Sequence, residues 1–156
     1  MTDYNNTRIA KLREYLFENI NTLTTKRDYQ INANFLSDKI DDYSLDKMPV
    51  APVITRLICG VEIRKDVYSF RSHKPYASDW LVNLNNMGFF EDFEKLINSN
   101  NKKRCLPDIE GIESIKCLNP FTMLSNEDGT KAIFDIQLEI TYRENNEREV
   151  LSLWKK

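Results

Sequence analysis

Residues that build catalytic and metal sites are scarce in this sequence. Its 156 residues include one histidine, three cysteines and four glycines, which are Gly60, Gly88, Gly111 and Gly129. A single histidine excludes multi-histidine metal sites and the HExxH pair of metalloproteases. The glycines are too far apart for a Walker A loop or a GxGxxG fingerprint, and no GxSxG elbow occurs. We therefore predict that the chain has no catalytic residue, binds no cofactor and is not an enzyme.

The cysteines indicate neither a disulfide framework nor a metal site. Their number is odd and no two of them form a CxxC pair; they are Cys59, Cys105 and Cys117. An odd count fits a reducing compartment with buried free thiols better than a set of disulfides. It also argues against a cysteine-based zinc site, so we predict that no metal is bound.

Long apolar runs and an excess of one charge sign are both absent. No stretch approaches about 18 consecutive apolar residues, and the first residues lack the basic-then-apolar pattern of a signal peptide. The 22 lysines and arginines nearly balance the 24 aspartates and glutamates, which gives a net charge of −2. We therefore expect neither a membrane partner nor specific nucleic-acid binding. With 41% hydrophobic and 29% charged residues, the chain is typical of one soluble globular domain spanning residues 1–156.

Two polar groups deserve consideration as sites. His73 lies among cations and directly before a proline, in the run Arg71–Pro75. A general base needs an orienting acid and a nearby nucleophile, so we interpret His73 as a solvated loop histidine. A run of four aspartates could bind a cation but lacks EF-hand spacing, and we interpret it as a solvated loop. These aspartates are Asp38, Asp41, Asp42 and Asp46.

Three stretches have the apolar spacing of amphipathic helices. The first covers about residues 6–20, where apolar side chains recur every three or four positions. Ser78 is a suitable N-cap for a second helix, which Gly88 would end in the left-handed conformation. A third stretch, residues 89–97, has an aromatic stripe of the kind that fills a core and can also supply part of an interface. The side chains expected to face inward from the second helix are Trp80, Leu81, Leu84 and Met87.

Four segments are predicted to be strands, because they are rich in β-branched and aromatic residues. Gly60 separates the first two. The second changes the parity of its apolar residues, which a bulge or burial on both faces would explain. The last alternates cleanly, as in an antiparallel strand with one wet face. The segments are residues 53–59, 61–71, 112–118 and 132–142.

The remaining regions have weak patterning. Residues 22–49 have only scattered apolar positions and are predicted to form a long connection. The sequence after Tyr142 is polar and then ends in an apolar group at residues 150–154. We expect this group to form an added strand or a docking tail that packs on another surface. Together the elements predict a single α+β domain, with an approximately four-stranded, mainly antiparallel sheet packed with flanking helices.

The order of several short motifs resembles that of a bacteriophage family, the tail terminator or minor capsid proteins. The resemblance covers residues 35–142; residues 1–34 hold the N-terminal helix and connection, and residues 143–156 form a C-terminal extension without a counterpart. Leu96 and Phe134 stand where the family has Trp and Tyr, and both keep apolar bulk. The motifs are Tyr43-Ser44-Leu45-Asp46 followed by Pro49, a strand ending at Gly60, Tyr68-Ser69-Phe70-Arg71, Tyr76-Ala77-Ser78-Asp79, Asn83-Leu84, Gly88-Phe89-Phe90-Glu91-Asp92-Phe93, Asn101, Leu106-Pro107 and the final strand from Ala132 to Tyr142.

This resemblance implies a structural protein of the virion. By this resemblance, the chain would be a small α+β subunit that forms a homohexameric ring with other copies on the tail tube. The ring stops polymerisation of the tube, joins it to the head connector and, in contractile tails, contacts the sheath; the same part caps headless phage-tail-like bacteriocins. The implied partners are other copies of the chain, the tail tube protein, the sheath protein and the connector, with DNA passing through the ring. The implied location is the head-proximal end of the tail, after assembly in the cytoplasm of the bacterial host.

Three alternatives remain open. One is a head-completion or connector minor capsid subunit. Another is a small cytoplasmic enzyme with a carboxylate pair, formed by Glu91 or Asp92 with Asp46. A nucleic-acid regulator is disfavoured by the acidic balance and the lack of a helix-turn-helix signature. For the ring, we expect the contacts to come from residues 22–49 and residues 150–154, because both have sparse internal patterning.

Overall fold

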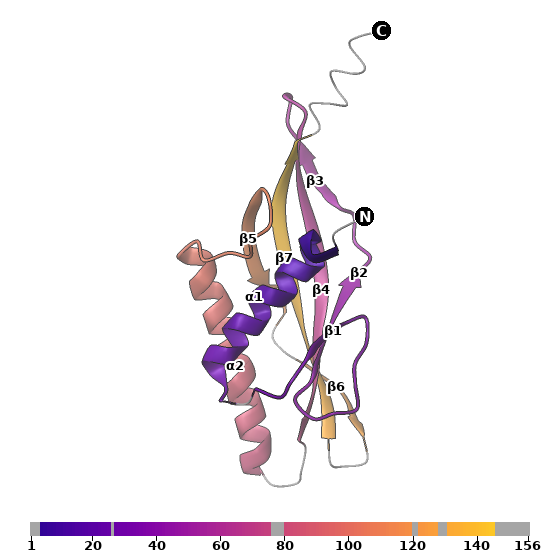
Figure 1. Cartoon of the computed structure of the whole chain (residues 1–156), viewed down its shortest axis with the longest axis vertical. Coiled ribbons are helices and arrows are strands. Elements are labelled where there is room, and N and C mark those ends of the chain that lie inside the picture. The colour runs from indigo at the N-terminus through magenta and orange to yellow at the C-terminus, as the bar shows by residue number, and fades with distance from the viewer. Residues whose placement is uncertain (1–3, 26, 76–79, 120–121, 128–130, 146–156) are drawn as a thin grey trace.

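The computed structural model of the chain describes residues 4–25, 27–75, 80–119, 122–127 and 131–145. It is an elongated single α+β domain in which two helices pack on one mixed sheet (Figure 1). No helix among the residues described is long and apolar enough to cross a membrane. The elements are a 3₁₀ turn (Tyr4–Asn6), α1 (Arg8–Leu23), β1 (Ile31–Ala33), β2 (Tyr43–Met48), β3 (Val53–Arg56), β4 (Val61–Pro75), α2 (Trp80–Lys102), β5 (Ile112–Cys117), β6 (Thr122–Glu127) and β7 (Lys131–Asn145).

Two long strands, β4 and β7, form the spine of the sheet. They pair antiparallel over all 15 residues, from Val61 opposite Asn145 to Pro75 opposite Lys131. The sheet order is β1-β2-β4-β7-β5, while β3 pairs with the start of β4 and β6 pairs with the start of β7. The pair β1–β2 is parallel, and the other pairs are antiparallel. The four predicted strands correspond to β3, β4, β5 and β7, but seven strands are described rather than about four.

Strands β1 and β2 correct the prediction that residues 22–49 form a long connection. In β2, Tyr43 and Leu45 turn into the core, while Asp46 lies on the opposite face because side chains alternate along a strand. The Asp42 carboxylate accepts a hydrogen bond from the Gln30 backbone N–H at 2.9 Å, which holds the chain entering β1 beside β2. The polar residues that weakened the pattern therefore face away from the helices or satisfy backbone groups.

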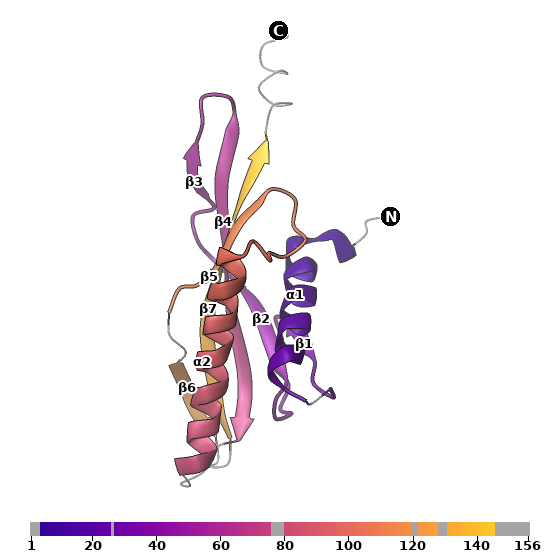
Figure 2. The ribbon, with the colours of Figure 1, turned by 90° about the vertical axis from the view of Figure 1, so that its left-hand side faces the viewer.

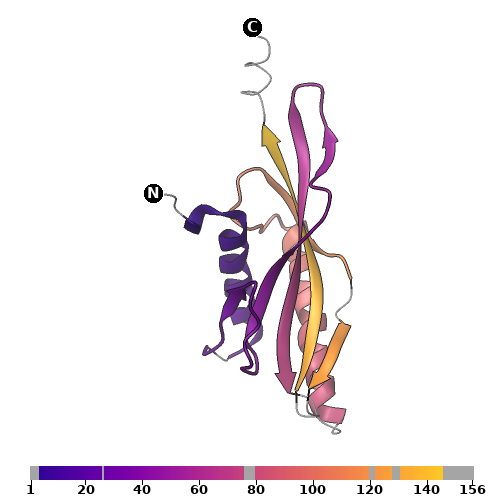
Figure 3. The same ribbon diagram turned by 90° about the vertical axis from the view of Figure 1, so that its right-hand side faces the viewer.

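Both helices cover the same face of the sheet (Figures 2 and 3). The core between the layers combines α1 residues, α2 residues and the inward side chains of β2, β4, β5 and β7. Phe70 lies at its centre, with its ring 5.1 Å from that of Tyr43 and 5.4 Å from that of Phe93. The aromatic stripe predicted for residues 89–97 therefore fills the core, through Phe90, Phe93 and Ile97.

The first predicted helix is confirmed. The hydroxyl of Thr7 accepts a hydrogen bond from the Ala10 backbone N–H at 3.3 Å, so Thr7 caps α1 at its N-terminus. The helix continues to Leu23, three residues beyond the predicted end. Its buried residues recur at the predicted spacing and are Leu12, Tyr15, Leu16 and Ile20.

The second and third predicted helices are one helix, α2. Gly88 lies inside it and does not end it, which overturns the predicted stop at that residue. Leu81, Leu84 and Met87 are about half-exposed rather than inward, because the buried side of α2 is set by Phe90 and Phe93 further along the helix. The proposed cap Ser78 and the side chain of Trp80 lie outside the part of the chain that the structure describes.

The change of parity in β4 reflects burial on both faces. The β4–β7 register runs without a shift, so there is no bulge between these two strands. Val67 is buried on one face, while Tyr68 and Phe70 are buried on the other. Strand β7 confirms the alternating segment 132–142 and extends it to Asn145. The apolar group at residues 150–154 falls outside the described residues.

Candidate assembly surfaces

The hairpin formed by β3 and β4 ends in an exposed apolar tip. Leu57 and Ile54 are 40% and 50% exposed, and Ile58 is fully exposed. Turn positions usually carry polar or small residues, so the exposed Leu57 and Ile58 in the turn, with Ile54 in β3, form a candidate contact surface. The tip lies at one end of the long axis of the molecule (Figure 1). We call Ile54, Leu57 and Ile58 the hairpin tip.

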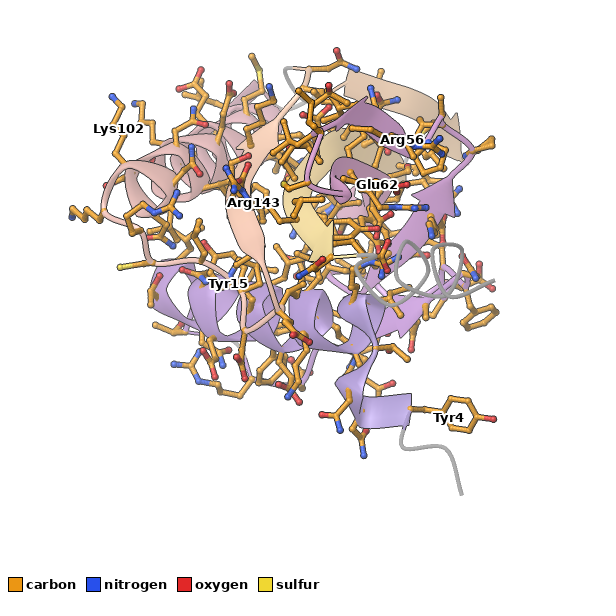
Figure 4. The ribbon with its side chains drawn as sticks, turned by 90° about the horizontal axis from the view of Figure 1, so that it is seen from above. Tyr4, Tyr15, Arg56, Glu62, Lys102 and Arg143 are labelled. Atoms are coloured by element: carbon orange, nitrogen blue, oxygen red, sulfur yellow. The ribbon has the colours of Figure 1, made fainter. Side chains whose placement is uncertain are left out.

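The hairpin is held in a defined shape. Gly60 has φ of +88°, which a glycine adopts without strain, and its N–H donates to the Leu57 carbonyl at 3.0 Å. Below the turn, the nearly buried carboxylate of Glu62 lies 3.1 Å from Arg56 Nε and 2.9 Å from Arg64 Nη1. Figure 4 looks along the molecule onto this end, where Arg56 and Glu62 lie together. The hairpin is therefore a pre-formed arm rather than a loose loop.

The second apolar surface lies on α2. Leu81, Leu84 and Met87 are 50%, 51% and 46% exposed and follow one another at intervals of three residues. This spacing places them along one side of the helix. They lie in the first two turns of α2, at the end of the molecule opposite the hairpin (Figures 1 and 2). We call these three residues the helix stripe.

Gly88 continues the helix stripe on the exposed side of α2. A Cβ atom added to it would have no described heavy atom within 4 Å, apart from its chain neighbours and the nearby turns of the helix. A glycine inside a helix costs about 0.5–1 kcal/mol relative to alanine. Since packing within the subunit does not require a glycine there, the residue is suited to the close approach of another chain.

A group of charges fixes α1 to the sheet. Arg8 Nε lies 2.7 Å from Asp66 Oδ2, and the guanidinium lies 4.5 Å from the ring centre of Tyr142. The hydroxyl of Tyr68 donates to the same carboxylate oxygen at 3.2 Å, and Lys47 Nζ lies 3.7 Å from the other oxygen. Burial, together with the Asp66 charge, raises the pKa of Tyr68 above its ordinary value. The Asp66 carboxylate is thus satisfied by its neighbours and has a structural role.

Lys74 is a buried cation surrounded by aromatic rings. Its Nζ lies 3.1 Å from Asp41 Oδ1 and 2.9 Å from the hydroxyl of Tyr43. The same nitrogen lies 4.3 Å from the ring centre of Phe89 and 4.7 Å from that of Tyr43. Burial raises the pKa of Tyr43, which stays protonated, and its neutral hydroxyl oxygen accepts the hydrogen bond from Lys74. A cavity of about 350 Å³ opens beside this group, between Tyr29, Asn86 and Phe89.

A cavity of about 620 Å³ lies beside the start of α1. Its lining carries three cations and three carboxylates, so it has no strong preference for a ligand of either charge. Lys11 Nζ already lies 3.9 Å from the Asp108 carboxylate across its mouth. The charged residues of the lining are Arg8, Lys11, Asp108, Glu110, Arg143 and Glu144.

The structure corrects the interpretation of His73 as a solvated loop residue. His73 lies in β4 and is only 3% exposed, because the strand continues to Pro75 instead of ending at Arg71. Its Nδ1 lies 2.7 Å from the Ser37 carbonyl oxygen. His73 therefore fastens residues 34–42 to the sheet. The proline after it marked the end of the strand and not a loop before it.

The four aspartates do not form one group. Asp42 accepts from Gln30 N–H and from the Ser37 hydroxyl, at 2.9 and 2.7 Å, and Asp41 pairs with Lys74. Asp46 accepts from the Ser44 hydroxyl at 2.7 Å and pairs with Arg71 on the face of the sheet away from the helices. Across the described ranges, no group of three or more His, Cys, Asp or Glu residues could hold a metal ion. Asp38 is exposed and Asp41 lies half-buried in a turn, whereas Asp42 is buried and Asp46 lies in β2. The solvated-loop interpretation is therefore wrong for Asp42 and Asp46.

The carboxylate pair of the enzyme alternative is not assembled. Glu91 and Asp92 are exposed on α2, whereas Asp46 points to the opposite side of the sheet. The cysteines are free, as predicted, but Cys59 and Cys105 are exposed instead of buried. Cys117 is half-buried, and burial raises the pKa of its thiol to about 12.

Of the two regions expected to make ring contacts, only residues 22–49 are largely described. Their most exposed large apolar side chain is Phe35, at 62%. The hairpin tip and the helix stripe were not predicted as contact regions. The available signal was the apolar Leu57-Ile58-Cys59 in a turn before Gly60. For α2, the amphipathic pattern led to the wrong side of the helix. No protein-family model matches the chain, and no curated protein matches it either.

Proposed function

We propose that this protein is a tail terminator: a virion structural protein that forms a ring on the tail tube, stops its growth and joins it to the head connector, or caps a headless phage-tail-like bacteriocin. The observation that carries the proposal is the order of the short motifs between residues 35 and 142, from Tyr43-Ser44-Leu45-Asp46 to the final strand ending at Tyr142. Three of these motifs lie in β2, β4 and α2: they are Tyr43-Ser44-Leu45-Asp46, Tyr68-Ser69-Phe70-Arg71 and the motif from Gly88 to Phe93.

The architecture of the subunit supports this function. Two apolar surfaces on different elements, at opposite ends of an elongated molecule, suit contacts between unlike surfaces of neighbouring copies (Figure 1). Contacts of this type close into rings when the rotation between copies divides a full turn. The charged clusters around Asp66 and Lys74 are internally paired, so they are consistent with a structural role.

The charge of the chain also fits a ring through which DNA passes. A net charge of −2 gives the subunit no general attraction for the phosphate backbone. A channel built from such subunits would let DNA move without holding it. Polar side chains on the helix-free face of the sheet are paired with one another, for example Lys116 with Glu139 at 3.4 Å.

The test is to measure native mass and tube capping on the same preparation. The purified full-length chain is sized by light scattering and imaged by negative stain, alone and after addition of tail-tube protein. We expect a closed ring of about six copies, in solution or on tube ends, and tubes whose growth stops when the protein is added. Tubes that neither bind the protein nor stop growing would overturn the proposal, and binding to purified head connector instead would favour the connector subunit.

A further inference from the structure

We infer that the hairpin tip of one copy packs on the helix stripe of the next copy, so that the subunits follow one another head to tail around the ring. This inference rests on the ring proposed above and specifies its contact. It assigns the interface to Ile54, Leu57 and Ile58 on one side, and to Leu81, Leu84 and Met87 on the other. Residues 22–49 are then not the main contact region.

The two surfaces match in chemical character and differ in shape. Each presents three large apolar side chains that are 40% or more exposed. The hairpin tip is a narrow projection, held by the Glu62 ion pairs, while the helix stripe is a ridge on one side of α2. In a closed ring, the hairpin tip of each copy covers the helix stripe of the next copy, so no tip and no stripe stays exposed. A symmetric dimer that joins tip to tip would leave both stripes exposed.

Gly88 explains how the tip can approach the helix closely. It lies one turn after Leu84 on the exposed side of α2, and the space above it is open among the described residues. The absence of a side chain there lets a neighbouring backbone come nearer to the helix axis than any other residue would allow. Within the subunit, the same glycine only lowers the stability of the helix.

Charge complementarity points to the same pairing. Hairpin residues 50–65 hold three cations and one carboxylate, and helix residues 80–95 hold three carboxylates and one cation. Arg56 and Arg64 already pair with Glu62, and Arg64 also pairs with Glu144 of β7, so the positive excess at the hairpin is small. Opposite charges around an apolar centre guide association and fix the orientation of the partners. The charged residues are Arg56, Glu62, Arg64 and Lys65 on the hairpin and Glu91, Asp92, Glu94 and Lys95 on α2.

The distance between the surfaces makes the contact intermolecular. Strand β4 alone contains 15 residues, and at about 3.3 Å each they separate the hairpin from the start of α2 by roughly 50 Å. A tip therefore cannot reach the stripe of its own chain. Six such lengths placed end to end would give a ring of roughly 90 Å in diameter, with the long axis of each subunit along the circumference.

Disulfide trapping tests the contact directly, because Cys59 lies next to Ile58 and is exposed. The probe is the full-length chain with Leu84→Cys and Cys105→Ser, oxidised with copper–phenanthroline after assembly in solution or on tail tubes. We expect a ladder of covalent multimers on a non-reducing gel that ends at the ring size. Adding Cys59→Ser should abolish the ladder. Phe35→Cys in place of Leu84→Cys is the matched control, at another exposed apolar position, and should give no ladder.

A second measurement avoids dependence on cross-linking. Ile58→Asp and Leu84→Asp should each reduce the assembled mass to that of a single chain, while Phe35→Asp leaves the ring intact. All three should keep the far-UV circular dichroism of the parent, because the positions are exposed in the single chain. A ring that caps tubes but gives no Cys59-dependent ladder and tolerates both aspartates would overturn the contact and keep the proposed function. A Cys59-dependent ladder from a protein that caps no tubes would establish the contact and overturn the function. A chain that stays monomeric with and without tubes would overturn both.

Discussion

Arg8 Nε and Asp66 Oδ2 lie 2.7 Å apart although the two residues are 58 positions apart in the sequence. This ion pair joins the first turn of α1 to the middle of β4, just below the hairpin. Because Asp66 is almost fully buried, the pair also satisfies a carboxylate that has little contact with water. The start of α1 and the base of the hairpin therefore hold one another in place.

Arg8→Met should lower the free energy of unfolding by about 1–3 kcal/mol, because it removes a charged hydrogen-bond partner from a buried carboxylate. Urea unfolding followed by circular dichroism measures the loss. Lys11→Met is the matched control on the same helix. Its ion pairs, at 3.8 and 3.9 Å, reach exposed carboxylates, and removing them should change stability by less than about 1 kcal/mol. Equal losses in the two variants would contradict the role given to Arg8.

The stability of the protein should fall as the pH rises above 10. Burial raises the pKa of Tyr43 and Tyr68 above the ordinary value of 10.0. Above this pH the unfolded chain loses these protons while the folded chain keeps them, so each tyrosine lowers stability by about 1.4 kcal/mol per pH unit until its folded pKa is reached. Tyr43→Phe should reduce this alkaline slope by about 1.4 kcal/mol per pH unit, which is the contribution of one tyrosine. An unchanged slope in urea unfolding between pH 10 and 11.5 would contradict the burial effect.

Thiol labelling should separate the three cysteines. With a disulfide-exchange reagent at pH 8, two thiols per native chain should react quickly, because Cys59 and Cys105 are exposed. Cys117 should react only after unfolding, since burial raises the pKa of its thiol to about 12 and keeps it protonated. In the assembled ring the count should fall to one, because the proposed contact covers Cys59. Two fast thiols in the ring would argue against that contact.

Gly88→Ala should stabilise the isolated subunit and weaken the ring. Alanine has the better helix propensity and meets no described atom at this position, so the free energy of unfolding should rise by about 0.5–1 kcal/mol. The added methyl group should at the same time hold the neighbouring hairpin away and lower the assembled fraction. Asn98→Ala, at an exposed position later in α2, is the control that should leave assembly unchanged. A ring of unchanged stability in Gly88→Ala would contradict a close approach at this position.

The sequence predicted the elements whose packing is local and repetitive. The stripe of α1, with Leu12, Leu16 and Ile20, and the alternation in β7 both follow from the geometry of a single element facing one core. These patterns depend on no distant part of the chain. The α+β class followed from them, and so did the position of the aromatic stripe around Phe93.

The rest depended on long-range contacts. Strand β2 became a strand because Leu45 packs opposite Phe70, 25 residues later, while its other residues are polar and looked like a loop. Gly88 is a good helix terminator by local rules, but the packing of Phe90 and Phe93 carries α2 through it. His73 was misplaced because the pairing of β4 with β7 extends the strand to Pro75. The hairpin tip was missed because turn positions usually carry polar or small residues, and no local rule predicts large apolar side chains there.

The pairing of β4 with β7 sets the point in synthesis at which the hairpin gains its support. The hairpin rests on residues 61–63 of β4, and these pair with residues 143–145 of β7, which lie 80 to 84 positions later in the sequence. During synthesis, the base of the hairpin therefore lacks this partner strand until residue 145 has left the ribosome. Because contacts between such distant residues also form slowly, the arm takes shape late in folding. A nascent chain that still lacks this arm would be unable to make the proposed ring contact.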